Sequence, residues 1–260
     1  MFIYLDKESP LHRLHPVTKI AGLILLFIWA MVFNHPLYLS VIFLMVFFLS
    51  ILAKCLSNLK KFSIILVILA FFSTLLWSFF LRGPTQLLKL GLIQISKESL
   101  FYGLAMGIRI DTMIVSGIIF LSSTRTEDFT LGLSSLGLPF PVSFALSLSF
   151  RLVPTFAATS STIVQAQKSR GLDLESGRLW KRIRKHIPLF IPIIIYAIRN
   201  TDLLAMALES KGFGFKKRRT YYLQFRSTWQ DWLSISILAG LITFSFYLRL
   251  NDYGVIFHRI

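Results

Sequence analysis

The sequence predicts an all-α integral membrane protein with about five transmembrane helices and long amphipathic helices on the cytoplasmic side. Only 15% of its 260 residues are charged and 55% are hydrophobic, whereas soluble domains carry about 25% charged residues. The hydrophobic residues also gather in long runs, and the runs 62–81 and 232–248 contain no charge. A transmembrane helix needs about 20 mostly apolar residues, so runs of this length indicate membrane spans.

The first uncharged region, residues 20–53, is too long for one transmembrane helix. It has 34 residues and would be about 51 Å long as a helix, whereas the hydrocarbon core is about 30 Å thick. Asn34-His35-Pro36 in its middle is a turn signal. We therefore expect two helices, at about 18–33 and 37–53, with one long kinked helix as the alternative.

Three further spans are expected, at about 62–81, 102–123 and 231–249. The fourth span contains Gly103 and Gly107 in a Gly-x-x-x-Gly pattern. Small residues at this spacing let two membrane helices approach each other closely. We therefore expect close helix packing at this glycine pair.

The fourth span also contains two charged residues, Arg109 and Asp111. Charges inside a membrane are costly and usually face protein or an interface. Residues two apart do not share a helix face, so these two are not expected to pair with each other. We expect each to find a partner on another helix or to extend towards the interface, and their role is otherwise open.

Most of the positive charge lies between the fourth and fifth spans. Residues 151–226 contain 15 Lys/Arg and 4 Asp/Glu, and positive residues stay on the cytoplasmic side of a membrane protein. In the cell (plasma) membrane we therefore expect a membrane domain at 1–124, a cytoplasmic domain at 125–228, and a last span within 229–260. The N-terminus is also expected to be cytoplasmic. Prolines interrupt the apolar stretches of the middle domain, so we expect long amphipathic helices there, with an extra span as the alternative.

Residues needed for several kinds of chemistry are missing. A single cysteine, Cys55, excludes an internal disulfide and a thiolate metal cluster, and the five histidines show no metal-ligand spacing. No Gly-x-x-x-x-Gly-Lys-Ser/Thr loop occurs, so we do not expect the chain to bind ATP in that way. We expect no metal, no cofactor and no enzymatic activity. We also expect no nucleic-acid partner, because the positive charge follows the membrane topology.

Two segments of the middle domain end alike. Residues 161–171 align without gaps on residues 202–212, and they end in Ser169-Arg170-Gly171 and Ser210-Lys211-Gly212. A glycine just past a helix end takes the left-handed conformation without strain, and a cation in the last turn gains about 0.3–1 kcal/mol from the helix dipole. The alternative is that both cations dock into acidic grooves of a partner, where arginine can bind a carboxylate through two hydrogen bonds.

These twin endings resemble the two Ala-Arg-Gly motifs of the T component of energy-coupling factor (ECF) transporters, the family that includes the cobalt transporter permease. Three other stretches are similar to motifs of that family, in the same order. Residues 9–19, Ser-Pro-Leu-His-Arg-Leu-His-Pro-Val-Thr-Lys, are similar to its SxLHxLDPRTKL segment. Residues 124–128, Thr-Arg-Thr-Glu-Asp, are similar to TTxPED, and residues 151–154, Arg-Leu-Val-Pro, to RxIP.

The resemblance implies a membrane scaffold that joins two ABC-type ATPase subunits to a small substrate-binding membrane protein, the S component, for vitamin or transition-metal uptake. It also implies two long coupling helices, with Arg170 docking on one ATPase and Lys211 on the other, each between its flanking serine and glycine. Ser169 and Ser210 stand where the family has alanine, and Lys211 stands where it has arginine. Lysine keeps the positive charge but lacks the planar guanidinium that forms two parallel hydrogen bonds with a carboxylate.

Two groups of cations in the middle domain are candidates for contact with anionic lipids. They are Lys181, Arg182, Arg184 and Lys185, and Lys216, Lys217, Arg218 and Arg219. Each cation near a membrane surface adds about 1 kcal/mol, so a basic membrane-surface scaffold without transport is an alternative function. A membrane-bound lipid-modifying enzyme is another, although the acidic pairs 127/128 and 173/175 have no histidine motif beside them.

Overall fold

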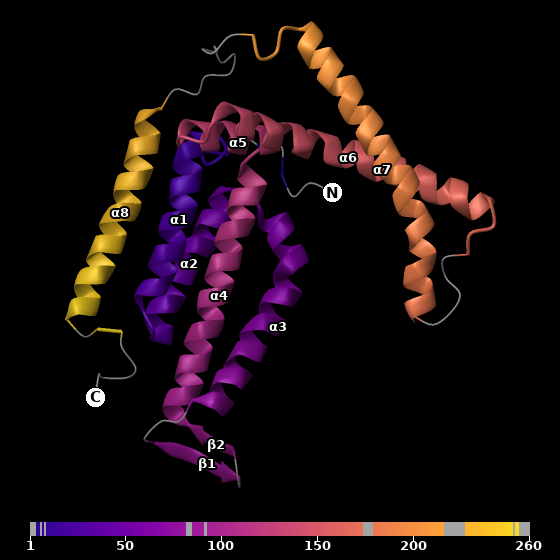
Figure 1. The fold of residues 1–260 in the computed structure, drawn as a ribbon. Coiled ribbons are helices and arrows are strands. Elements are labelled where there is room, and N and C mark those ends of the chain that lie inside the picture. Colours follow the sequence, from indigo (N-terminus) through magenta and orange to yellow (C-terminus); the bar gives the residue numbers. More distant parts are fainter. Residues whose placement is uncertain are drawn as a thin grey trace. The chain divides into compact units, whose positions relative to one another are not determined.

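The computed structural model describes residues 4–5, 7, 9–81, 85–90, 93–173, 179–215, 227–251 and 253–254 (Figure 1). The chain divides into two compact units, Met1–Pro139 with Phe225–Ile260, and Phe140–Gln224. The first unit contains α1 (Pro16–Val32), α2 (Pro36–Leu52), α3 (Leu56–Phe80), β1 (Gln86–Leu90), β2 (Ile93–Ser96), α4 (Lys97–Ser123), α5 (Thr126–Ser135) and α8 (Trp229–Leu250). The second unit contains α6 (Phe140–Ser169) and α7 (Leu179–Ser210).

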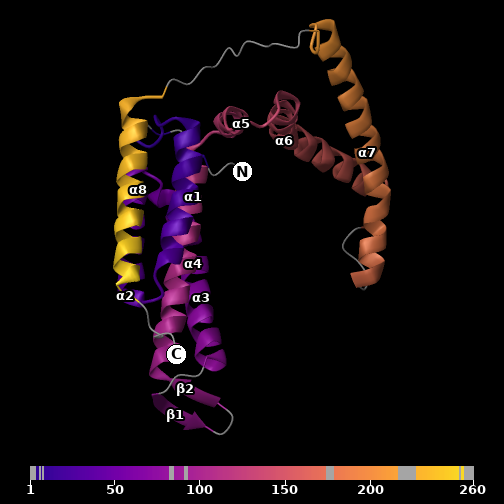
Figure 2. The same cartoon turned by 60° about the vertical axis from the view of Figure 1, so that its left-hand side comes forward.

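The predicted all-α membrane fold is confirmed, with one addition. Strands β1 and β2 form an antiparallel hairpin, which lies beside the adjoining ends of α3 and α4 (Figure 2). Within the described residues, five helical segments are long and apolar enough to cross a membrane: α3, α4, α6, residues 184–210 of α7, and α8. The chain is therefore a multi-pass membrane protein.

The set of candidate spans differs from the predicted one at two places. Helices α1 and α2 have 17 residues each, which is at the lower limit of about 17–25 for a span. Helix α6 and most of α7 are apolar enough to span, although they fall in the interval that we expected to be cytoplasmic. The boundaries at 124 and 228 and the side of the membrane on which 125–228 lies stay predictions.

The long helices expected in the second unit are present, and prolines lie inside them. Pro154 lies inside α6, which has 30 residues, and Pro188 and Pro192 lie inside α7, which has 32. A proline removes one backbone N–H and leaves a carbonyl without its helical partner. Side chains, water or small local adjustments can satisfy that carbonyl, so a long helix can continue past a proline. The expectation of long helices in this part of the chain is therefore confirmed, with the prolines inside them.

The turn expected at Asn34-His35-Pro36 is confirmed. Helix α1 ends at Val32 and α2 begins at Pro36, where a proline loses no helical hydrogen bond because the first N–H groups have no helical partner. The Nδ1 atom of His35 accepts a hydrogen bond from the backbone N–H of Leu37 at 3.3 Å. His35 therefore caps the second helix while the chain reverses.

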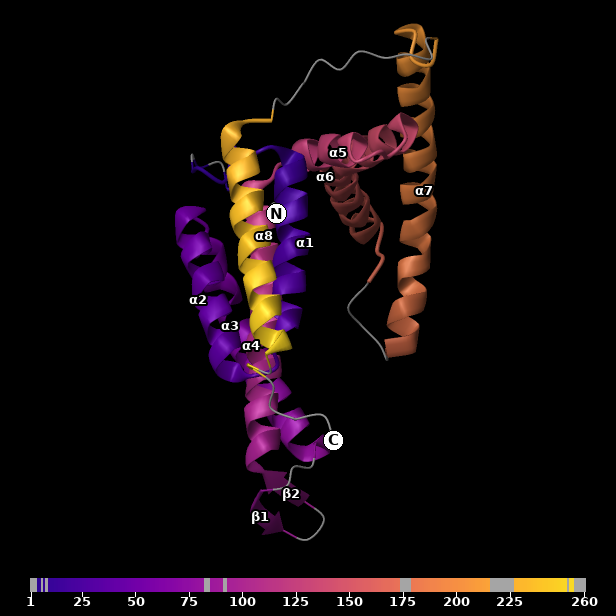
Figure 3. The same cartoon turned by 90° about the vertical axis from the view of Figure 1, so that its left-hand side faces the viewer.

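Helix α4 packs against α1, α2 and α3 in the first unit (Figure 3). A Cβ atom on Gly103 would stand 2.8 Å from the carbonyl oxygen of Thr74, and one on Gly107 would stand 3.0 Å from that of Ala70. Both carbonyls belong to α3. The predicted close approach of two helices at this glycine pair is confirmed.

Arg109 binds the end of α1. Its Nε donates to the carbonyl oxygen of Ala30 at 3.1 Å, and its Nη2 donates to the carbonyl oxygen of Phe33 at 2.5 Å and to Oδ1 of Asn34 at 2.7 Å. The last carbonyls of a helix have no helical partner, so the guanidinium completes α1. The expectation of a partner on another element is confirmed for Arg109. Asp111 Oδ1 is buried without a hydrogen-bond partner in the described part of the chain, and its role stays open.

Helix α8 packs along α1 (Figure 3). Near the start of α1, Oδ1 of Asp231 accepts a hydrogen bond from the backbone N–H of His15 at 2.7 Å. In the middle, Nε1 of Trp29 donates to Oγ of Ser245 at 2.8 Å. At the end, Arg249 donates to the last carbonyls of α1. Three separate contacts therefore hold α8 in register with α1.

Helices α6 and α7 cross in the second unit (Figure 1). At mid-length, the rings of Phe156 and Tyr196 meet edge to face with centroids 6.0 Å apart. A second contact joins the end of α7 to the start of α6, because the ring of Phe213 lies 4.5 Å from that of Phe144 and 6.2 Å from that of Phe140. We call Phe140, Phe144 and Phe213 the aromatic clamp.

Candidate functional site

The first predicted docking residue, Arg170, lies at the C-terminal end of α6. The helix ends at Ser169, and Gly171 has a φ of +88°. The N–H of Leu172 donates to the carbonyl oxygen of Gln167 at 3.0 Å, and the N–H of Gly171 donates to that of Lys168 at 3.0 Å. This pair of bonds is a Schellman motif, which satisfies carbonyls that the helix leaves open.

The end of α7 repeats this geometry around Lys211. Gly212 has a φ of +72°. The N–H of Phe213 donates to the carbonyl oxygen of Leu208 at 2.9 Å, and the N–H of Gly212 donates to that of Glu209 at 2.8 Å. The repeat seen in the sequence therefore corresponds to the same backbone motif at both helix ends.

The two glycines are required by conformation and not by space. A Cβ atom added to Gly171 or to Gly212 would meet no atom within 4 Å. Both residues, however, have the positive φ that residues with a Cβ atom rarely adopt. The position before each glycine, where Arg170 and Lys211 stand, is exposed. The glycines thus end each helix so that a cation stands at its tip.

The serines that replace the family's alanines interact with their own helices. Oγ of Ser169 donates to the carbonyl oxygen of Gln165 at 3.1 Å, and Oγ of Ser210 donates to that of Ala207 at 2.9 Å. Each hydroxyl therefore has a hydrogen bond without any partner protein. Their small volume, rather than their polarity, is what they share with alanine.

The two helix ends differ in how they are held. The residue after Gly212 is Phe213, which belongs to the aromatic clamp and packs on the first turns of α6. The residue after Gly171 is Leu172, which is half-buried. Sequence reasoning missed this difference, because Phe144 and Phe213 lie far apart in the chain.

The predicted lipid-contact residues are only partly described. Arg184 is exposed, and Nζ of Lys185 lies 3.9 Å from a carboxylate oxygen of Asp173. The side chains of Lys181 and Arg182, and the whole run from Lys216 to Arg219, lie outside the described residues. Lipid contact by these groups stays a prediction.

The N-terminal segment that resembles a family motif forms a network of hydrogen bonds. Nε2 of His12 donates to the carbonyl oxygen of Leu5 at 3.0 Å, and Oγ of Ser9 bonds to Nδ1 of His12 at 2.6 Å. Nζ of Lys19 donates to the carbonyl oxygens of His12 at 2.9 Å and Ser123 at 2.8 Å. The segment therefore joins the start of α1 to the end of α4.

The residues 124–128 lead from α4 into α5. Glu127 and Asp128 lie in the first turn of α5, where a negative charge is favoured by the helix dipole. Burial raises the pKa of the Asp128 carboxyl, and the charges of Lys19 and Arg125 oppose that shift. This acidic turn therefore faces cations of the same end of the first unit.

Comparison with known proteins places this multi-pass helical protein among transporter membrane components. The family model described as "cobalt transport protein" matches residues 7–222. The chain belongs to that family and is a transmembrane component of an ECF transporter.

Relatives cover nearly the full length of the chain. It is 32% identical over 263 residues to the energy-coupling factor transporter transmembrane protein EcfT of Listeria innocua, with 95% of this chain and 96% of the relative aligned. It is 30% identical to EcfT of Streptococcus thermophilus, with 95% and 97% aligned. It is 31% identical to EcfT of Thermosediminibacter oceani, with 92% and 93% aligned.

Proposed function

We propose that the chain is the scaffold of an ABC-type ECF importer, which couples ATP hydrolysis by two partner ATPase subunits to movement of a substrate-binding S component. The imported substrate would be a vitamin or a transition metal. The observation that carries this proposal is the pair of Schellman helix ends, each of which exposes one cation. The names of the relatives support the transporter class.

In this proposal, each cation docks into an acidic groove of one ATPase. Arg170 can form two parallel hydrogen bonds with a carboxylate, whereas Lys211 acts as a single point charge. The two docking contacts are therefore unequal in geometry. This difference between the two contacts is compatible with two different ATPase subunits, and also with a homodimer that is bound unequally.

The crossed helices would carry movement from the ATPases to the S component. The contact between Phe156 and Tyr196 and the aromatic clamp join α6 and α7 at two places, so displacement of one helix end is transmitted to the other helix. Exposed apolar residues follow one face of α7 at helical spacing: Ile187, Phe190, Ile191, Ile194 and Ile198. Such a stripe is a candidate surface for an apolar membrane partner.

The orientation that fits this function has the N-terminus and residues 125–228 on the cytoplasmic side. The excess of positive residues in 151–226 supports that orientation. Labelling of single cysteines placed at exposed positions such as Ser169 and Arg13, in intact cells and in opened vesicles, tests it. Labelling of both positions from outside intact cells would contradict it.

Charge reversal at the two helix ends tests the coupling role. The double variant Arg170→Glu with Lys211→Glu should insert in the membrane but should no longer copurify with the ATPase pair or support uptake. Arg199→Glu is a matched control, because it reverses an exposed charge inside α7. Uptake and ATPase copurification at the original level in the double variant would contradict the proposal.

A further inference from the structure

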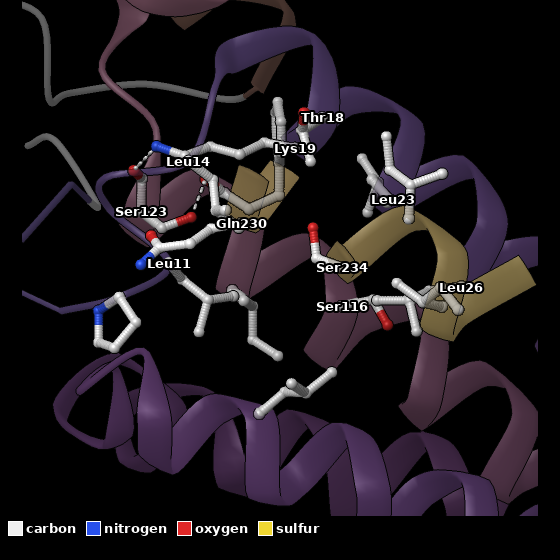
Figure 4. A pocket seen from close by; sticks show the side chains of 17 residues that line it. Leu11, Leu14, Thr18, Lys19, Leu23, Leu26, Ser116, Ser123, Gln230 and Ser234 are labelled. Carbon is white, nitrogen blue, oxygen red and sulfur yellow. Dashed lines mark hydrogen bonds between the residues drawn. The ribbon is translucent and has the colours of Figure 1, made fainter. Parts of the chain in front are cut away.

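The first unit contains an apolar pocket of about 330 Å³ between α1, α4 and α8 (Figure 4). The N-terminal segment contributes Pro10, Leu11 and Leu14, and α2 contributes one residue, Leu49, to its walls. Gly22 on α1 and Ile235 on α8 also line it. The pocket belongs to the first unit, whereas the helix ends proposed to dock the ATPases belong to the second.

Several polar groups of the pocket wall form hydrogen bonds within the protein. Nζ of Lys19 donates to two backbone carbonyls. Oγ of Ser116 donates to the carbonyl oxygen of Thr112 at 2.8 Å, and Oγ of Ser234 donates to that of Asp231 at 2.9 Å. The remaining wall is mainly aliphatic carbon, so the pocket suits an apolar chain better than a polar substrate.

The dimensions of the pocket suit one leaflet of a bilayer. Its wall runs from Thr18 to Leu26 on α1 and from Gln230 to Leu238 on α8. Eight residues of helix rise about 12 Å, and one leaflet provides about half of a 30 Å hydrocarbon core. The pocket is therefore about as long as the acyl region of one leaflet, and an acyl chain that enters from one side of the membrane can lie along it.

Exposed cations lie on the two chain segments that meet at the end of the bundle where the pocket begins. Lys7, Arg13 and Arg125 are exposed, and the bond from the N–H of Leu5 to the carbonyl oxygen of Ser122 at 3.1 Å brings the N-terminal segment to this end of α4. The acids Glu127 and Asp128 lie at the same end in α5. The exposed lysine and arginines can attract the phosphate of a lipid headgroup.

We propose that this pocket binds one acyl chain of a membrane phospholipid that has an anionic headgroup, with the phosphate at the cationic end of the bundle. Apolar atoms gain dispersion energy from each close contact with another apolar group. A bound acyl chain makes such contacts with α1, α4 and α8 together. The lipid thus acts as a packing element of the membrane unit.

Glycine positions provide a matched test. A Cβ atom on Gly22, which lines the pocket, would meet no atom within 4 Å, and the same is true of Gly240 on α8. Gly22→Leu should fill the pocket, whereas Gly240→Leu adds the same side chain elsewhere. Ser116→Leu is a second filling variant from α4, because within the described residues its hydroxyl bonds to its own helix.

The experiment uses the full chain in vesicles of phosphatidylglycerol and phosphatidylcholine, with a photoreactive group at the end of one acyl chain of either lipid. We expect phosphatidylglycerol to label α1 and α8 peptides of the wild-type chain and of Gly240→Leu. Labelling should be several-fold weaker in Gly22→Leu and Ser116→Leu, while the helix content by circular dichroism is unchanged. Undiminished labelling in both filling variants would overturn the acyl-chain site. Equal labelling by phosphatidylcholine would overturn the headgroup assignment.

Discussion

Replacing Phe213 with alanine should loosen the end of α7 that presents Lys211. The ring of Phe213 packs 4.5 Å from that of Phe144 and 6.2 Å from that of Phe140, measured between centroids. Removal of a fully buried phenylalanine ring costs about 3–5 kcal/mol. Phe213 is 36% exposed, so about two-thirds of that cost, about 2–3 kcal/mol, should be lost from the packing of the end of α7 against α6.

Hydrogen–deuterium exchange measures this loss directly. Because about 1.4 kcal/mol corresponds to a tenfold change, amide exchange at residues 208–213 should become about 30- to 140-fold faster in Phe213→Ala. The two Schellman hydrogen bonds are backbone bonds and remain possible in the variant, so the change reports the aromatic contact. Phe213→Tyr should restore most of the protection, since a tyrosine ring has the same apolar faces.

Leu172→Ala is the matched control at the other helix end. Leu172 follows Gly171 as Phe213 follows Gly212, but it is not part of the aromatic clamp. We expect exchange at residues 167–172 to change much less. Equal acceleration at the two ends, or unchanged exchange in Phe213→Ala, would refute the role of the clamp.

Three further substitutions test other features of the fold. Gly103→Leu should lower the melting temperature in detergent, because its Cβ would stand 2.8 Å from a backbone oxygen of α3. The control Gly117→Leu has open space at its Cβ and should be tolerated. Equal melting temperatures for the two variants would contradict the close approach of α3 and α4. Arg109→Met should lower the free energy of unfolding of the membrane unit by roughly 3 kcal/mol or more, because a hydrogen bond to a charged group contributes about 1.5–3 kcal/mol and Arg109 forms several. Chemical unfolding in detergent measures the change, and an unchanged unfolding midpoint would contradict the prediction. Gly212→Ala should cost about 1–2 kcal/mol at the end of α7, because alanine is strained at a φ of +72°, and unaltered local amide exchange would show that the glycine is dispensable there.

Local signals in the sequence predicted the features that depend on neighbouring residues. The turn at Asn34-His35-Pro36, the glycine pair at Gly103 and Gly107, and the two glycine helix ends each depend on a few residues in a row or at helical spacing. The physical preferences of proline, histidine and glycine act at that range. All of these features therefore follow from the sequence without knowledge of the tertiary structure.

Long-range contacts could not be predicted in the same way. The sequence indicates that Arg109 needs a partner, but the carbonyl of Phe33 lies 76 residues away in the chain. The aromatic clamp joins residues from different helices, and many other aromatic residues of this chain were equally available for such a contact. The pocket needs α1, α4 and α8 to be placed together before it exists, and no pattern within one helix indicates it.

The prolines of the second unit lie inside long helices for a physical reason. In water, an internal proline costs about 3 kcal/mol or more, which favours helix ends at Pro154, Pro188 and Pro192. A helix of 30 residues keeps most of its other hydrogen bonds, and groups nearby can satisfy the freed carbonyl. Proline alone is therefore a weak boundary signal in long apolar helices.

The contacts of α8 with both ends of α1 have a consequence for the order of assembly. Asp231 accepts a hydrogen bond from the backbone N–H of His15, the residue that precedes α1 in the chain. Arg249 donates to backbone carbonyls at the C-terminal end of α1. Synthesis reaches Asp231 and Arg249 more than 200 residues after these sites on α1. In the nascent chain, Arg109 of α4 can bind the end of α1 first, and the contacts from α8 form only after all the intervening residues have been made.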